Sequence, residues 1–147
     1  MMEISIIIPT LNRKECLERC LDSILIQKSP IVKEILVIIN GVDLAAKTLL
    51  ESKYCKVPSI KYFQVKQMTP GQARNYATKH ATSSFIHFID DDTKLPTFYY
   101  RNLENFIHLH PQALIIGGPD QAPKDSNYWQ YSFGLALESQ FCTGSTS

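Results

Sequence analysis

Three consecutive aspartates, Asp90, Asp91 and Asp92, are the residues of this 147-residue chain best suited to chemistry. They directly follow an apolar stretch at residues 85–89. Neighbouring carboxylates at a protein surface repel each other by roughly 1 kcal/mol per pair, and helix capping explains one such residue rather than three. A divalent cation would relieve the repulsion, since Mg²⁺ and Mn²⁺ combine one or two carboxylates with phosphate oxygens of a substrate. The run predicts a metal and phosphate site, with capping and solvated charge as the alternative.

Several cationic and polar side chains are candidates to face this site. Arg74 is the strongest, because a guanidinium is a planar, permanently charged fork of donors. Arg13 and Lys14 lie near the end of the first apolar stretch and are further candidates. Each has the alternative of pairing locally on a helix surface. Asn12 stands three residues before Glu15, as in a capping box, so we expect it to be an N-cap first and a ligand contact second.

Other chemical motifs are weak or missing in the sequence. The four histidines are not spaced as ligands of one metal ion. No Cys-x-x-Cys pair occurs among the four cysteines, and we expect them to be free thiols in a reducing cytoplasm. An Asp-x-Asp-x-Thr phosphotransfer motif would place its threonine one position later than Thr93. Neither a glycine-rich phosphate loop nor a Gly-x-Ser-x-Gly elbow is found.

The hydrophobic pattern alternates between strand-like and helix-like segments, and we expect each strand to be followed by a helix. Strands are expected at residues 4–8 (ended by Pro9), 31–39, 59–65, 85–89 and 113–116, and helices at about 13–27, 44–53, 69–81 and 96–109. This order predicts an α/β fold, a mostly parallel, Rossmann-like sheet with helices on both faces. Ligands of such sheets bind outside the carboxyl ends of the strands, where residues 9–13, 40–41, 90–92 and 117–118 would gather.

Composition narrows the class of protein. Hydrophobic residues make up 44% of the chain, enough for a sizeable core, and the net charge of +1 argues against a general nucleic-acid binder. The charge is uneven, at +5 over residues 1–80 (12 basic minus 7 acidic) and −4 over residues 81–147 (3 minus 7). No stretch reaches the roughly 18–20 apolar residues of a membrane span. We expect a cytoplasmic protein, with peripheral membrane association left open.

Four sequence elements in order carry a family resemblance. They are Ile-Ile-Ile-Pro-Thr-Leu-Asn-Arg at 6–13, Asn-Gly at 40–41, Gly-Gln-Ala-Arg-Asn at 71–75 and Phe-Ile-Asp-Asp-Asp-Thr-Lys-Leu-Pro at 88–96. Together they resemble the family 2 glycosyltransferases of the GT-A fold over about residues 3–119. The resemblance implies a metal-dependent transfer of a sugar from a nucleotide-diphosphate donor to an acceptor hydroxyl, with inversion.

The resemblance also implies roles for individual residues. Pro9 and Thr10 would line the pocket for the base, Arg74 would lie beside the base or ribose, and Asp91 would contact the ribose. Asp92 would bind the divalent metal, Mn²⁺ or Mg²⁺, and Asp90 would complete the Asp-x-Asp pattern. The predicted nucleotide-binding set is Pro9, Thr10, Asn12, Arg13, Asn40, Arg74, Asp90 and Asp91.

The chain departs from the family pattern in two places. Ile39 stands where family members commonly carry an acid that binds the base, and Asn40 would substitute for it in part. A Gly-x-x-x-x-x-Arg stretch and an acidic general base are not recognisable, Asp120 and Glu138 being the acids near that region. We therefore expect a donor-binding domain at residues 1–119 and a partial acceptor-side segment at 120–147, with the catalytic base and the acceptor unassigned.

Two other functions fit the same residues. One is a module that binds a nucleotide sugar and metal without turnover. The other is a small α/β signalling domain whose acidic loop binds Mg²⁺, although a receiver-type domain needs a lysine on its last strand and Lys124 falls in an expected loop.

Overall fold

The computed structural model describes residues 2–118. The chain divides into two units, Met1–Leu109 and His110–Ser147. The first unit alternates strands and helices in the predicted order. Its elements are β1 (Ile4–Thr10), α1 (Lys14–Leu25), β2 (Val32–Asn40), α2 (Leu44–Lys53), β3 (Ile60–Val65), α3 (Pro70–Thr78), β4 (Phe85–Phe88) and α4 (Tyr99–Leu109).

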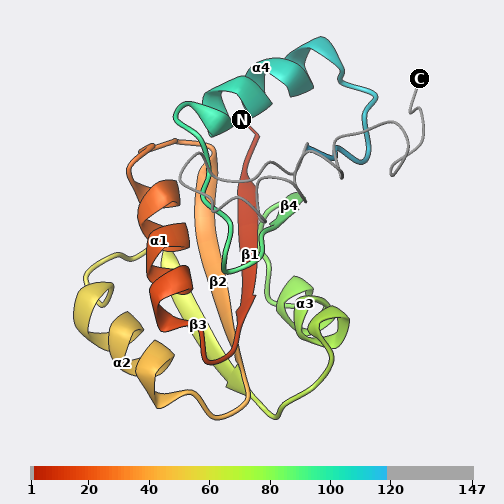
Figure 1. Ribbon diagram of the computed structural model, residues 1–147. Coiled ribbons are helices and arrows are strands. Elements are labelled where there is room, and N and C mark those ends of the chain that lie inside the picture. The colour runs from red at the N-terminus through yellow and green to blue at the C-terminus, as the bar shows by residue number, and fades with distance from the viewer. Residues whose placement is uncertain (1, 119–147) are drawn as a thin grey trace, which may run out of the picture. The chain divides into compact units, whose positions relative to one another are not determined.

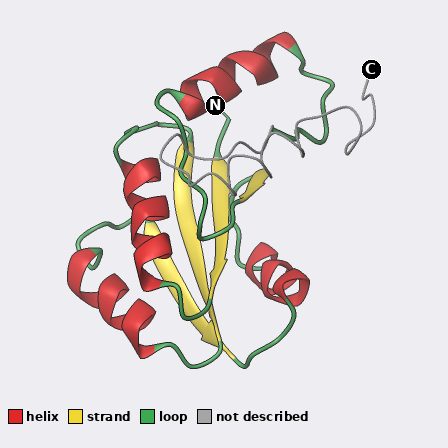
Figure 2. Cartoon of the chain, in the orientation of Figure 1, coloured by secondary structure: helices red, strands yellow, loops and turns green. Residues whose placement is uncertain are grey.

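The four strands form one parallel sheet in the order β3-β2-β1-β4 (Figure 1). Helices α1 and α2 cover one face, and α3 covers the other (Figure 2). The larger core joins alternate β1 and β2 residues to α1, α2 and the wholly buried Tyr100 of α4. The smaller core packs Ile7, Leu36 and Ile38 against Ala73 and Ala77 of α3. The expected α/β fold, with a parallel sheet and helices on both faces, is confirmed.

Strand β1 runs two residues further than predicted, through Pro9 to Thr10. Proline cannot donate to a strand ladder, so a strand is expected to end before it. However, β4 pairs only with residues 4–7 of β1, while β2 pairs with β1 as far as Thr10. Beyond Ile7 the strand is therefore paired on one side, where a proline is tolerated.

The prediction that Asn12 caps the first helix is wrong. Arg13 occupies the N-cap position and makes no side-chain cap, and Asn12 has a left-handed backbone, with φ of 55°. Asn12 lies one residue before the N-cap, and its left-handed backbone differs from the β-region conformation typical of capping residues. Thr69, by contrast, forms a capping box with Gln72, and Pro70 follows at the first helical position, as predicted.

The expected fifth strand at residues 113–116 is not formed. In the described part of the second unit, residues 110–118, the chain makes a turn and an irregular segment. Leu114 and Ile115 are 95% and 93% exposed. An apolar run becomes a strand when a ladder partner is available, and these residues have no paired strand in the described structure.

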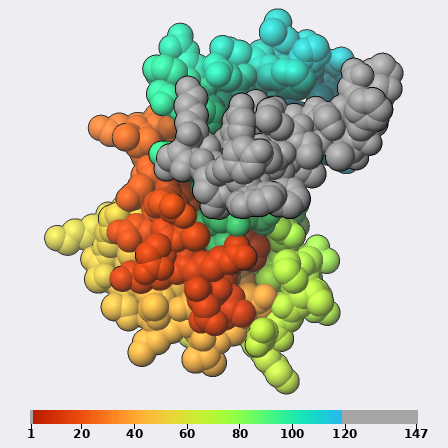
Figure 3. Space-filling view, viewed as in Figure 1, coloured from red at the N-terminus to blue at the C-terminus, as the bar shows by residue number. Residues whose placement is uncertain are grey.

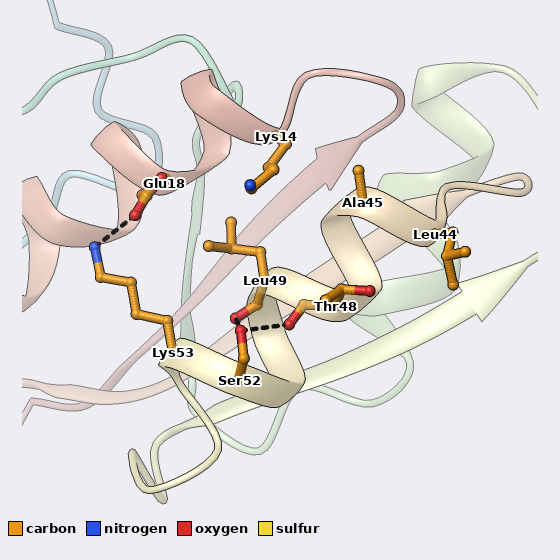
Figure 4. A pocket seen from close by; sticks show the side chains of 8 residues that line it. All are labelled: Lys14, Glu18, Leu44, Ala45, Thr48, Leu49, Ser52 and Lys53. Carbon is orange, nitrogen blue, oxygen red and sulfur yellow. Dashed lines mark hydrogen bonds and ion pairs between the residues drawn. The ribbon is translucent and has the colours of Figure 1, made fainter.

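A hollow of about 610 Å³ lies between α1 and α2, whose side chains adjoin on one side of the molecule (Figure 3). Lys14 lines this hollow, and Lys53 of α2 forms an ion pair with Glu18 of α1 at its wall (Figure 4). None of the other predicted site residues lines this hollow, which therefore lies away from the aspartate run. No helix in residues 2–118 is long and apolar enough to span a bilayer.

Candidate functional site

The aspartate run lies at the point where the direction of strand order changes. From β1 the chain moves through β2 to β3 on one side, and β4 then lies on the other side of β1. The loops leaving β1 and β4 therefore diverge from adjacent carboxyl ends, the usual position of ligand sites in open parallel sheets. We call residues 10–13 and 90–92 together the β1–β4 rim.

Asp91 is the buried centre of the β1–β4 rim. It is 5% exposed, and its Oδ2 accepts a hydrogen bond of 2.7 Å from the Thr10 hydroxyl. Arg13 lies 3.3 Å from Asp91 Oδ1 and 3.0 Å from Asp92 Oδ2 through the same nitrogen, Nη1. Burial raises the pKa of Asp91, while the Thr10 hydrogen bond and the Arg13 charge oppose the rise. These contacts join the two rim loops, which are about eighty residues apart in sequence.

The outer carboxylates point to different cations. Arg74, in the first turns of α3, pairs with Asp90, as the sequence predicted for a cation facing the run. The Nε of Arg74 is buried and has no hydrogen-bond partner among the described residues. Two arginines therefore offset the repulsion of three carboxylates, and one donor of Arg74 is left without a partner.

The rim residues fit a divalent cation that takes one protein ligand. The Asp92 side chain is 56% exposed at the carboxyl edge of the sheet. No group of three or more His, Cys, Asp or Glu side chains converges on a metal position within residues 2–118. Mg²⁺ or Mn²⁺ held by Asp92 would complete its shell with diphosphate oxygens and water, which is the usual set for these ions.

Asp43 holds the loop that carries Arg13. It is 4% exposed, caps α2 by accepting from the Ala46 amide at 2.9 Å, and accepts from the Asn12 amide at 2.6 Å. The left-handed Asn12 is thus anchored through its backbone. Asp43 is not among the residues predicted for the site, although an Asp just before an apolar helical pattern is a recognisable N-cap signal.

Asn40 also has local partners. Its side-chain amide donates to the Met68 carbonyl at 2.8 Å and accepts from the Met68 amide at 2.9 Å. It therefore ties the end of β2 to the segment before α3. Ile39, where the family commonly has an acid, is fully buried in the larger core. Pro9 lies in the β1–β2 ladder opposite Ile38.

A hollow of about 520 Å³ opens beside the rim, at the carboxyl ends of β1, β2 and β3. Gly41, with φ of 135°, forms part of its wall, and Gln64 donates to the Gly41 carbonyl at 3.1 Å. Three polar residues of this wall, Gln64, Lys66 and Gln67, are not among the residues predicted for the site. Their position at the end of the third strand was the available signal. The lining residues are Leu11, Asn12, Gly41, Val42, Gln64, Val65, Lys66 and Gln67.

The parallel sheet with helices on both faces defines an α/β domain of the GT-A class. The chain belongs to glycosyl transferase family 2, whose family model matches residues 5–142. The match extends past the boundary at residue 119 that the sequence motifs suggested. Residues 119–147, including the candidate bases Asp120 and Glu138, lie outside the described residues.

Two curated relatives are longer proteins. The chain is 25% identical over 118 residues to the poly(ribitol-phosphate) beta-N-acetylglucosaminyltransferase TarS of Staphylococcus aureus, covering 79% of this chain and 21% of TarS. It is 35% identical over 120 residues to an uncharacterized glycosyltransferase of Rickettsia conorii, covering 74% and 18% of the two chains. The chain thus spans about a fifth of the length of these relatives.

Solved structures share the fold. A crystal structure of TarS residues 1–349 matches with a TM-score of 0.67 at 25% identity, over 84% of this chain and 40% of that one. A mannosyltransferase from Pyrobaculum calidifontis, solved with GDP-Man and Mn²⁺, matches with a TM-score of 0.69 at 20% identity, over 84% and 36%. The similarity to the second structure supports the fold alone.

Proposed function

We propose that this chain binds the nucleotide diphosphate of a sugar donor at the β1–β4 rim, as the donor side of a metal-dependent glycosyltransferase. The observation that carries the proposal is the joining of Thr10, Arg13 and Asp91 at the strand-order change, with Arg74 paired to Asp90 beside them. The rim and the adjoining Arg74 offer cations and carboxylates to a ligand that itself carries phosphates. Membership of glycosyl transferase family 2 and the similarity to an N-acetylglucosaminyltransferase support the same function.

Residues of the rim and residues beside it have separate tasks in this proposal. The 520 Å³ hollow beside Asn12 and Gln64 would take the base, with Pro9, Thr10 and Asn40 shaping its surroundings. Asp91 would accept a hydrogen bond from a ribose hydroxyl. The unpartnered Nε of Arg74 would donate a hydrogen bond to the nucleotide sugar. Asp92 would hold Mn²⁺ or Mg²⁺, which supplies positive charge to the diphosphate as a leaving group.

The transfer itself involves an acceptor that remains to be identified. An acceptor hydroxyl would attack the anomeric carbon as the bond to the diphosphate breaks, with inversion at that carbon. Residues 120–147 are proposed to contribute to the acceptor side, with residues 1–119 as the donor domain. A cytoplasmic location is part of the proposal, since Cys16, Cys20 and Cys55 are free thiols in the described part of the chain.

Thermal unfolding with nucleoside diphosphates tests the donor site. A ligand at about 100 times its Kd stabilises the folded state by about 2.7 kcal/mol, which for a chain of this length raises Tm by roughly 10 °C. We expect UDP or GDP to raise Tm with Mn²⁺ present, and Asp92→Asn to remove the metal-dependent part of the rise while leaving the unliganded Tm within a few degrees.

Glu104→Gln, which removes one carboxylate from α4, is the matched control and should respond as the unmodified chain does. Absence of a shift with every nucleotide would contradict the donor site. Unfolding of the Asp92→Asn variant would instead assign the aspartate run a structural role. Binding without transfer, across a panel of nucleotide sugars and acceptors, would favour the module without turnover.

A further inference from the structure

Arg13 is placed to hold two carboxylates with one nitrogen. Its Nη1 lies 3.0 Å from Asp92 Oδ2 and 3.3 Å from Asp91 Oδ1. Its backbone is fixed between the anchored Asn12 and the first turn of α1, since Leu17 donates to the Arg13 carbonyl at 2.9 Å. The guanidinium, at the end of a 56% exposed side chain, is free to change direction while the backbone stays in place.

The two carboxylates differ in how firmly they are held. The Asp91 side chain is 6% exposed and also accepts from Thr10, so its position is fixed by a buried contact. The Asp92 side chain is 56% exposed, and among the described residues Arg13 is its hydrogen-bond partner. An exposed ion pair contributes little to stability. The Arg13–Asp92 pair is therefore the one in the rim that is easiest to separate.

A divalent cation and a guanidinium are competing partners for one carboxylate. A cation bound to Asp92 would sit close to Arg13 Nη1 and repel it, and the nearby diphosphate would offer the guanidinium a planar, bidentate partner. We propose that Arg13 exchanges partners on donor binding, neutralising Asp92 in the free protein and moving to the donor diphosphate when the metal arrives. This inference rests on the proposed function of the rim.

The exchange predicts two effects of opposite sign for Arg13→Gln. Without nucleotide, Mn²⁺ should bind more tightly, by about fivefold, because its competitor for Asp92 is gone. With saturating Mn²⁺, UDP or GDP should bind more weakly, by about tenfold, because a diphosphate contact is lost. A residue that merely supports the loop would weaken both affinities together.

Mn²⁺ binding to the full chain is measured from the electron paramagnetic resonance signal of free Mn²⁺, and nucleotide binding by calorimetry at saturating Mn²⁺. Arg19→Gln is the matched control, because it removes the same charge from an exposed position of α1, the helix that Arg13 precedes. Arg13→Lys, which keeps the charge but lacks the fork, should leave Mn²⁺ binding near that of the unmodified chain and weaken nucleotide binding.

The outcomes separate the inference from the function on which it rests. If the unmodified chain binds Mn²⁺ and nucleotide but Arg13→Gln behaves as Arg19→Gln, or both affinities shift in one direction, the partner exchange is overturned and the donor site stands. If the unmodified chain binds neither ligand, both proposals fail. If Arg13→Gln does not fold, failure of Arg13→Lys to weaken nucleotide binding overturns the exchange.

Discussion

Replacing Glu34 with alanine is expected to lower the free energy of unfolding by about 3 kcal/mol, because it leaves buried donors without their shared acceptor. Glu34 is 2% exposed on β2, at the amino end of the sheet opposite the rim. Its carboxylate accepts from the Ser5 hydroxyl at 2.7 Å, from the Thr82 amide and hydroxyl at 2.7 Å each, and from Lys61 at 2.9 Å. Equilibrium urea unfolding measures the loss.

The Glu34 network fixes the start of β4, the strand that leads to the aspartate run. Thr82 and Ser83 precede β4, and the Ser83 amide donates to Ser5, which itself donates to Glu34. Glu3→Ala is the matched control, because Glu3 forms an exposed pair with Lys33 and its loss should change stability by less than about 1 kcal/mol. Equal effects of the two substitutions would show that the Glu34 network contributes no more than a surface pair.

The Glu34 carboxylate also makes the free energy of unfolding depend on pH in the acid range. Burial alone raises its pKa, but hydrogen bonds from Thr82, Lys61 and Ser5 outweigh burial and lower the pKa from 4.5 to about 2. The folded state therefore favours the ionised form. This contribution is complete above about pH 4.5 and is lost as pH falls through about 2. Glu34→Gln should flatten the decline of stability across that interval.

Asp91→Ala is expected to be the most damaging change in the rim. Removal of the buried carboxylate takes away the hydrogen-bond acceptor of the Thr10 hydroxyl and one acceptor of Arg13. We expect the free energy of unfolding to fall by about 3 kcal/mol. Nucleotide affinity should fall tenfold or more, because the two rim loops are no longer joined.

A double-mutant cycle with Thr10→Val isolates the bond between the loops. Asp91→Asn, which still accepts from Thr10, should retain most of the stability. The effects of Asp91→Ala and Thr10→Val should be less than additive by about 1 kcal/mol or more, as for residues in contact. Additive effects in urea unfolding would contradict the role assigned to this bond.

Local patterns were sufficient to predict the eight elements of the first unit and the convergence at their carboxyl ends. The period of the apolar residues reports which face is buried, and Asp90–Asp92 and Arg74 carry a chemical signal in their types alone. The pairing of Arg74 with Asp90 follows from that signal once the parallel sheet is formed.

The local sequence pattern cannot predict features that depend on residues far away in the sequence. Pro9 continues β1 because β4 ends early, which no property of residues 4–10 reveals. Glu34 looks like a surface acid in a strand, and its partners Ser5 and Thr82 are 29 and 48 residues away. The apolar run at residues 113–116 has the composition of a strand, but it pairs with no other strand in the described structure. Composition alone does not reveal whether a partner strand is available.

The central claim, that the β1–β4 rim binds the donor diphosphate, is tested most directly by nuclear magnetic resonance. Amide shifts of the labelled chain would be followed as UDP or GDP is added with diamagnetic Mg²⁺. We predict saturable shifts at Leu11, Asn12 and Arg13, at Gly41 and Gln67 of the neighbouring hollow, and at residues 90–93. Shifts confined to the α1–α2 hollow around Thr48 and Ser52, or no saturable shift with any nucleotide, would contradict the claim.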